Sequence, residues 1–145
     1  MKSLLLAALA ALTLTTACKK DDDSPAPAPT PMQVTGTFSG ANEVPAVTTS
    51  ATGNVSATYN KSNKTLTYTV TYSGLTPTAG HFHIGAPGVA GPVVITFPYL
   101  AYSPITGSTL LTQLQEDALL AGNMYANLHT SANPSGEIRA NVVAK

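Results

Sequence analysis

The chain has 145 residues, of which only 10% are charged, and seven basic side chains balance seven acidic ones. The absence of a basic stripe argues against nucleic-acid binding, and no basic amphipathic segment indicates a helix lying on a membrane. A single cysteine excludes an intrachain disulfide.

Residues 1–17 have the pattern of a secretion signal peptide. Lys2 supplies the positive start, and the apolar stretch that follows is too short to span a membrane. The small residues 15–17 precede Cys18 as in a lipobox, although the usual aliphatic residue three positions before the cysteine is missing. We predict cleavage before Cys18 and stable anchoring through acyl chains on this residue. The alternative is an ordinary cleavage that leaves a free thiol.

Residues 18–33 are predicted to form a tether rather than part of a domain. Its Pro/Ala-rich section lacks core-forming side chains and favours an extended spacer of about 3 Å per residue. The acidic run Asp21-Asp22-Asp23 resembles signals that send some lipoproteins to the outer face of the outer membrane; the alternative is a solvated linker. We therefore predict an outer-membrane lipoprotein that faces the cell surface or the periplasm. Residues 34–145 suffice for one domain.

The first half of this domain has the two-residue period of strands. Apolar residues alternate with polar ones from Val34 to Phe38, from Val55 to Tyr59, and most regularly over 65–72. Residues 60–64, between the second and third runs, predict a hairpin connection. The pattern therefore predicts three strands that are each buried on one side.

The second half predicts four more strands and one helix. Short strands are expected over 80–84 and 93–97, joined by a Gly/Pro-rich loop. The apolar spacing over 109–121 predicts a helix, with Thr112 and Gln115 at capping-box spacing. The last two strands, over 124–129 and 137–143, are joined by a turn at 133–136. Seven or so short strands predict an all-β antiparallel sandwich or barrel with one short helix.

Six short motifs come in the order and spacing of a known family. They are Glu43-Val44-Pro45, Gly74-Leu75, His81-Phe82-His83-Ile84-Gly85, Gly91-Pro92-Val93-Val94, Tyr125-Ala126-Asn127-Leu128-His129-Thr130 and Gly136-Glu137-Ile138-Arg139. Residues 34–145 thereby resemble the CHRD domain, which is repeated in the secreted protein chordin and occurs singly in bacterial exported proteins. Phe82 departs from the Ile or Val that the family has more often. The resemblance implies an immunoglobulin-like β-barrel, loosely similar to Cu/Zn superoxide dismutase, and no settled molecular activity.

The three histidines are the strongest candidates for chemistry, and the chain has no others. His81 and His83 are two residues apart on a predicted strand, so both point to one face, and we expect them to point outward, away from the core. The strand ending at His129 is a candidate neighbour. Three imidazoles suit Zn²⁺ or Cu²⁺, and Glu43 or Glu137 could add an oxygen. The alternative, which the sequence favours, is a hydrogen-bonded network of the same side chains.

Two glutamates and an arginine form a second candidate cluster. Glu137 and Arg139 are two residues apart on the predicted last strand, and we expect them to pin this strand to the Glu43 loop through an ion-pair network. An acid/base pair of Glu43 and Glu137 is the less favoured alternative. Tyr68 is expected in the core with Tyr72, whereas the loop residues Tyr99 and Tyr102 remain open as surface contacts.

The sequence therefore favours a non-catalytic function. It contains no G-x-S-x-G motif, and a Cu/Zn dismutase site needs six histidines and an aspartate, which three histidines cannot build. We expect a membrane-anchored exported lipoprotein whose β-domain is a binding or structural module, with no certain cofactor. The alternative is a protein that binds Cu or Zn through His81, His83 and His129, with a redox enzyme as a remote extension.

Overall fold

The computed structural model describes residues 30–145. The predicted signal peptide, Cys18 and most of the predicted tether lie outside these residues. Within the described part of the chain, no helix is long and apolar enough to cross a membrane.

The described residues form eight strands, one α-helix and one 3-10 turn. The elements are β1 (Met32–Phe38), η1 (Gly40–Asn42), β2 (Thr52–Asn60), β3 (Thr65–Ser73), β4 (Ala79–Ile84), β5 (Val93–Thr96), β6 (Ile105–Leu110), α1 (Gln113–Leu120), β7 (Met124–His129) and β8 (Ile138–Ala144). All strand pairs are antiparallel. This confirms the predicted all-β class with one short helix.

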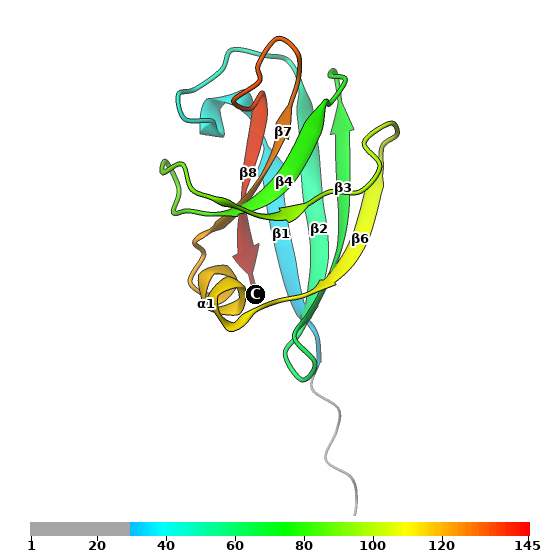
Figure 1. Ribbon diagram of the computed structural model, residues 1–145, viewed down its shortest axis with the longest axis vertical. Helices are drawn as coiled ribbons and strands as arrows, with labels where there is room; N and C mark the ends of the chain where they lie inside the picture. The colour runs from blue at the N-terminus through cyan, green and yellow to red at the C-terminus, as the bar shows by residue number, and fades with distance from the viewer. Residues whose placement is uncertain (1–29) are drawn as a thin grey trace, which may run out of the picture.

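The strands make one strongly curled sheet in the order β5-β4-β7-β8-β1-β2-β3-β6. The sheet folds so that β4 lies in front of β1 and β2, while α1 closes the end of the molecule beside the C-terminus of β8 (Figure 1). β1 and β8 share backbone hydrogen bonds near both of their ends, between Gln33 and Lys145 and between Ser39 and Arg139. These pairs join the two halves of the sheet into an open barrel.

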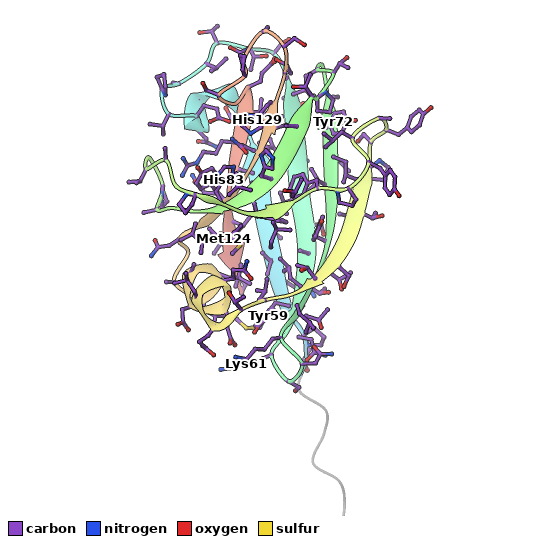
Figure 2. All side chains as sticks on the ribbon, in the orientation of Figure 1. Tyr59, Lys61, Tyr72, His83, Met124 and His129 are labelled. Carbon is purple, nitrogen blue, oxygen red and sulfur yellow. The ribbon has the colours of Figure 1, made fainter. Side chains whose placement is uncertain are left out.

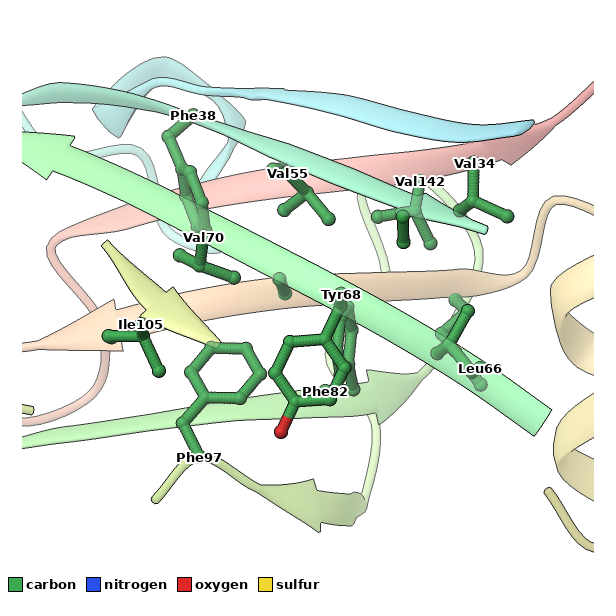
Figure 3. Close-up of a cluster of buried hydrophobic side chains, with 14 of the residues drawn as sticks. Val34, Phe38, Val55, Leu66, Tyr68, Val70, Phe82, Phe97, Ile105 and Val142 are labelled. Carbon is green, nitrogen blue, oxygen red and sulfur yellow. The ribbon is translucent and has the colours of Figure 1, made fainter. Parts of the chain in front are cut away.

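The core lies between the two halves of the curled sheet. Phe82 from β4 packs edge-on against Tyr68 from β3, with ring centroids 5.2 Å apart, and against Phe97, at 5.0 Å. Aliphatic side chains from β1, β2, β3, β6 and β8 surround these rings (Figure 3). The alternation over 65–72 is confirmed, because Leu66, Tyr68 and Val70 are buried while the threonines between them are half-buried or exposed. The hairpin and the inward faces of β1 and β2 are also as predicted.

The tyrosine predictions hold with one refinement. Tyr68 is buried, whereas Tyr72 is half-buried at the edge of the core and donates its hydroxyl hydrogen to the Leu100 carbonyl at 2.7 Å. Tyr99 and Tyr102 are 92% and 84% exposed, as expected for loop residues.

The predicted helix begins four residues too early, and one strand was missed. Residues 105–110 form β6, which pairs with β3, and the helix starts at Gln113. Gly107 is the reason that β6 can lie flat on β3, because a Cβ at this position would collide with the hydroxyl of Tyr68. The expected capping box of Thr112 and Gln115 is present.

The predicted apolar face of the helix region is also partly wrong. Leu110 and Leu114 are 71% and 69% exposed, while Leu119 is fully buried. Glu116 is buried instead, where it forms an ion pair with Lys64 at 3.1 Å. The leucines whose spacing predicted the longer helix therefore lie in two elements: Leu110 ends β6, whereas Leu114 and Leu119 belong to α1.

Truncating Phe82 tests the core directly. Phe82→Ala removes the ring that contacts both Tyr68 and Phe97, so we expect the free energy of unfolding to fall by about 3 to 5 kcal/mol. Tyr99→Ala, the control, removes an exposed ring and should change it by about 0.5 kcal/mol or less. Equal losses in urea denaturation of the two variants would contradict this core.

Candidate metal centre

The candidate centre lies on the outer face of two neighbouring strands, β4 and β7. β4 pairs with β7, and their register places His81 opposite Asn127 and His83 opposite Tyr125. His129 follows Asn127 by two residues and so shares its face. Figure 2 shows His83 and His129 on these strands, far from the hairpin that carries Lys61. The fold therefore brings all three histidines together, and His129 lies beside the pair for which the sequence made it a candidate neighbour.

The histidines lie on the outer face of the sheet, as expected, but His83 is not exposed to solvent. Phe82 points into the core, where it is 1% exposed, and Ile84 is half-buried. His83 points to the opposite face, yet it is only 7% exposed because residues 85–91 fold back over it. Its Nδ1 lies 2.9 Å from the Gly91 carbonyl oxygen. The loop thus turns an outer-face side chain into a buried one.

Arg139 of β8 holds this loop in place. Its Nη1 and Nη2 donate to the carbonyls of Val89 and Ala86 at 3.0 and 2.9 Å, and its Nε donates to Asn141 at 3.2 Å. The guanidinium lies 3.4 Å from the ring centroid of Tyr125, a cation–π contact. Arg139 is 1% exposed, so three of its five N–H groups and the face of the guanidinium have partners within the protein.

Tyr125 connects the arginine to the histidines. Its ring stacks on that of His83 with centroids 4.7 Å apart and planes 7° apart. Its hydroxyl oxygen accepts a hydrogen bond from the Gly91 amide at 3.1 Å. Gly91 has to be glycine, because a Cβ there would collide with the backbone of Ile84. This packing fixes the plane of the His83 ring.

Two backbone carbonyls determine the protonation of two imidazoles. The Nδ1 of His83 faces the Gly91 oxygen at 2.9 Å, and the Nδ1 of His129 faces the Pro134 oxygen at 2.8 Å. A carbonyl oxygen only accepts, so both Nδ1 atoms carry a proton, and each neutral ring keeps a free lone pair on Nε2. Both lone pairs are therefore directed away from the covering backbone.

These two Nε2 atoms converge on the side chain of Asn127. Its Oδ1 lies 2.9 Å from Nε2 of His83 and 3.0 Å from Nε2 of His129. Two lone pairs facing an oxygen repel unless something positive lies between them. Rotating the amide solves this, since the two N–H groups then donate to the two rings; this is the hydrogen-bonded network. A cation bound by both nitrogens and Oδ1 solves it equally well.

His81 supplies a third nitrogen to the same point. Its Nδ1 lies 3.2 Å from Nε2 of His129, close to the roughly 3.3 Å edge of a tetrahedron with zinc–nitrogen bonds of about 2.0 to 2.1 Å. One ligand atom from each of the three histidines lies within 4.8 Å of the others. A bound ion would thus draw the most distant imidazole inward. The carbonyls of Gly91 and Pro134 are the kind of outer partner that orients ligating histidines.

The local electrostatics favour neutral rings. Burial lowers the pKa of His83, and burial together with the neighbouring His129 and His83 lowers the pKa of His81. Among the described residues, the cluster includes no carboxylate that would stabilise imidazolium ions. Neutral imidazoles are the form that ligates metal ions.

The predicted ion-pair network of Glu43, Glu137 and Arg139 is wrong. Lys64 and Glu116 form the only ion pair within 4 Å in residues 30–145. Arg139 uses its N–H groups on uncharged oxygens, and its position beneath the loop explains why it meets no carboxylate directly.

Glu137 still ties the last strand to the preceding loops, but through hydroxyl groups. Its two carboxylate oxygens accept hydrogen bonds from Thr49 at 2.8 Å and from Thr130 at 2.6 Å. The bond from Thr130 is the main reason that the pKa of Glu137 lies below its usual value. Glu43 lies at the far side of the 133–136 turn, against Gly136, and adds no oxygen to the histidine cluster.

The comparison with protein families gives a match that fits this fold and site. The CHRD domain model matches residues 34–142, which is most of the chain. The structure is thus an open all-β barrel with a polar cluster on one outer face. The chain belongs to the CHRD domain family. No curated protein and no solved structure matched in the other two comparisons.

The pKa of Glu43 gives a test of the surroundings of the site. Burial raises it from 4.5 to about 7, outweighing the charge of Arg139, so ionisation costs folding free energy as the pH rises from about 4.5 to about 7. Glu43→Gln removes this cost. We expect its free energy of unfolding to exceed that of the wild type by about 1 to 2 kcal/mol at pH 8.

At pH 4 both proteins carry a neutral group at position 43, so their unfolding free energies should agree to about 0.5 kcal/mol. Urea denaturation at the two pH values measures both differences. A Glu43→Gln variant that is less stable than the wild type at pH 8 would contradict the raised pKa.

Proposed function

We propose that this protein is an exported lipoprotein whose CHRD domain binds one transition-metal ion, Zn²⁺ or Cu²⁺, through His81, His83 and His129. The observation that carries the proposal is the convergence of three ring nitrogens within 4.8 Å. Two of the rings are also oriented by carbonyls so that their lone pairs face each other across Asn127. The metal is thus the ligand of the binding module that the sequence led us to expect.

The proposed role is binding rather than catalysis. His83 and Asn127 are 7% and 3% exposed, and residues 85–91 cover one side of the cluster. Three imidazoles and Oδ1 of Asn127 would together fill the four positions of a tetrahedral ion. Such closed coordination is typical of metal sites that stabilise or present a structure, whereas catalytic sites keep a position open to substrate.

The proposed anchor is compatible with the direction in which the chain enters the domain. Met32 pairs with Tyr59, so β1 begins at the same end as the hairpin that carries Lys61 and Lys64. His129 lies toward the other end (Figure 2). A lipid on Cys18 would therefore be tethered to the lysine end of the domain, and the histidine cluster would lie toward the other end.

Metal titration tests the proposed ligand. We expect the metal-free protein to bind one equivalent of Zn²⁺ or Cu²⁺ with a dissociation constant below about 1 µM, and His83→Ala to weaken binding at least about 100-fold, since it removes a buried, preoriented ligand. Isothermal titration calorimetry measures both values, and Cu²⁺ spectra report nitrogen ligation.

Asp117→Asn, which changes an exposed side chain of α1, is the control and should bind as the wild type does. Asn127→Asp separates the metal site from a purely hydrogen-bonded network. A carboxylate at this position would strengthen metal binding roughly tenfold or more, because it adds an anionic ligand. Wild-type binding weaker than about 1 µM, or unchanged binding by His83→Ala, would eliminate the metal site.

Acylation is tested separately in growing bacteria. We expect the wild-type protein to incorporate a labelled fatty acid and to partition into detergent, because the acyl chains would be attached at Cys18. Cys18→Ser should lose the label and the partitioning while its folded domain retains metal binding. Unlabelled wild-type protein in the soluble fraction would contradict the proposed anchor without affecting the metal site.

A further inference from the structure

A cavity lies on the far side of the 133–136 turn, whose Pro134 carbonyl faces His129. Its volume is about 210 Å³. One wall is the loop after η1, and the other is the turn between β7 and β8. Apolar side chains dominate the lining, with polar groups at Asn133 and Ser135; the apolar residues are Val44, Pro45, Val47 and Pro134.

Among residues 30–145, Glu43 is the one charged side chain that lines this cavity. It is 8% exposed, and its Oε1 is fully enclosed without a hydrogen-bond partner. Gly136 makes room for the carboxyl group, because a Cβ at that position would collide with Oε1. A buried carboxylate oxygen without a donor is costly, and a cation bound at the part of the carboxylate that faces the cavity would offset this cost.

Within the described part of the chain, no basic side chain forms an ion pair with Glu43. Arg139 is the charged group whose field reaches the carboxylate, but three of its five N–H groups donate to Ala86, Val89 and Asn141, and it forms no ion pair with Glu43. Burial consequently outweighs its effect and raises the pKa of Glu43 to about 7. An external cation at the carboxylate would stabilise its ionised form.

We propose that this cavity binds a primary alkylammonium group, with the nitrogen at the carboxylate of Glu43 and the alkyl chain against Val44, Pro45 and Val47. The group can belong to a free amine or to the lysine side chain of a partner. Both share a compact cation with three donors on an apolar stem. A divalent metal ion fits less well, because Ca²⁺ and Mg²⁺ need several oxygen ligands and the walls here are mainly apolar.

The test uses the ¹⁵N-labelled full-length protein in detergent micelles at pH 8, where Glu43 is ionised and alkylammonium ions remain charged. Titration with n-butylammonium chloride, against sodium chloride at equal ionic strength, should give saturable amide shifts confined to residues 43–47 and 132–136. N-acetyl-lysine amide should produce the same pattern if a lysine side chain fits as well as a free amine. Shifts with butylammonium alone would identify free amines as the ligands.

Variants establish whether Glu43 and the apolar wall are responsible. Glu43→Gln keeps the shape of the side chain and should weaken butylammonium binding at least about tenfold, while Asp117→Asn, with the same change in charge on α1, should bind as the wild type does. Val44→Ser should reduce the preference for butylammonium over methylammonium. Non-saturating shifts, or equal binding by Glu43→Gln and the wild type, would overturn the proposal and leave the metal site untouched.

Discussion

The loop formed by residues 85–91 is the constraint on which the outer face of this domain depends. It covers polar side chains on β4, β7 and β8, and each of them needs a partner once water is excluded. Backbone carbonyls of the loop supply these partners, to Arg139 through Ala86 and Val89 and to His83 through Gly91. Glycine at position 91 lets the loop approach β4 closely enough to do so.

The hydrogen bonds that the covered histidines need also orient their rings as ligands for a metal ion. Once carbonyls fix the Nδ1–H groups of His83 and His129, the remaining lone pairs have to meet near Asn127. Pro134, whose carbonyl orients His129, also lines the cavity of Glu43. One turn thus separates the proposed metal centre from the proposed ammonium site.

Strand periodicity was enough to predict most of the fold, but the site only in part. The alternation over 65–72 identified β3. β6 was missed because Gly107 interrupts the strand pattern and the leucines after it have helical spacing. The shared face of the histidines followed from their spacing. Asn127 was overlooked although it shares a face with His129, since its role depends on a neighbouring strand. Arg139 was assigned to carboxylates because carbonyl partners in a loop leave no mark on the sequence.

The central claim is that backbone carbonyls direct two imidazole lone pairs toward one point. Long-range ¹H–¹⁵N NMR of the metal-free protein at pH 7.5 reports the tautomer of each ring directly. The structure predicts that His83 and His129 both carry their proton on Nδ1, with unprotonated Nε2 atoms that shift when Zn²⁺ is added. A proton on Nε2 of either ring, or Nε2 signals that Zn²⁺ leaves unchanged, would contradict it.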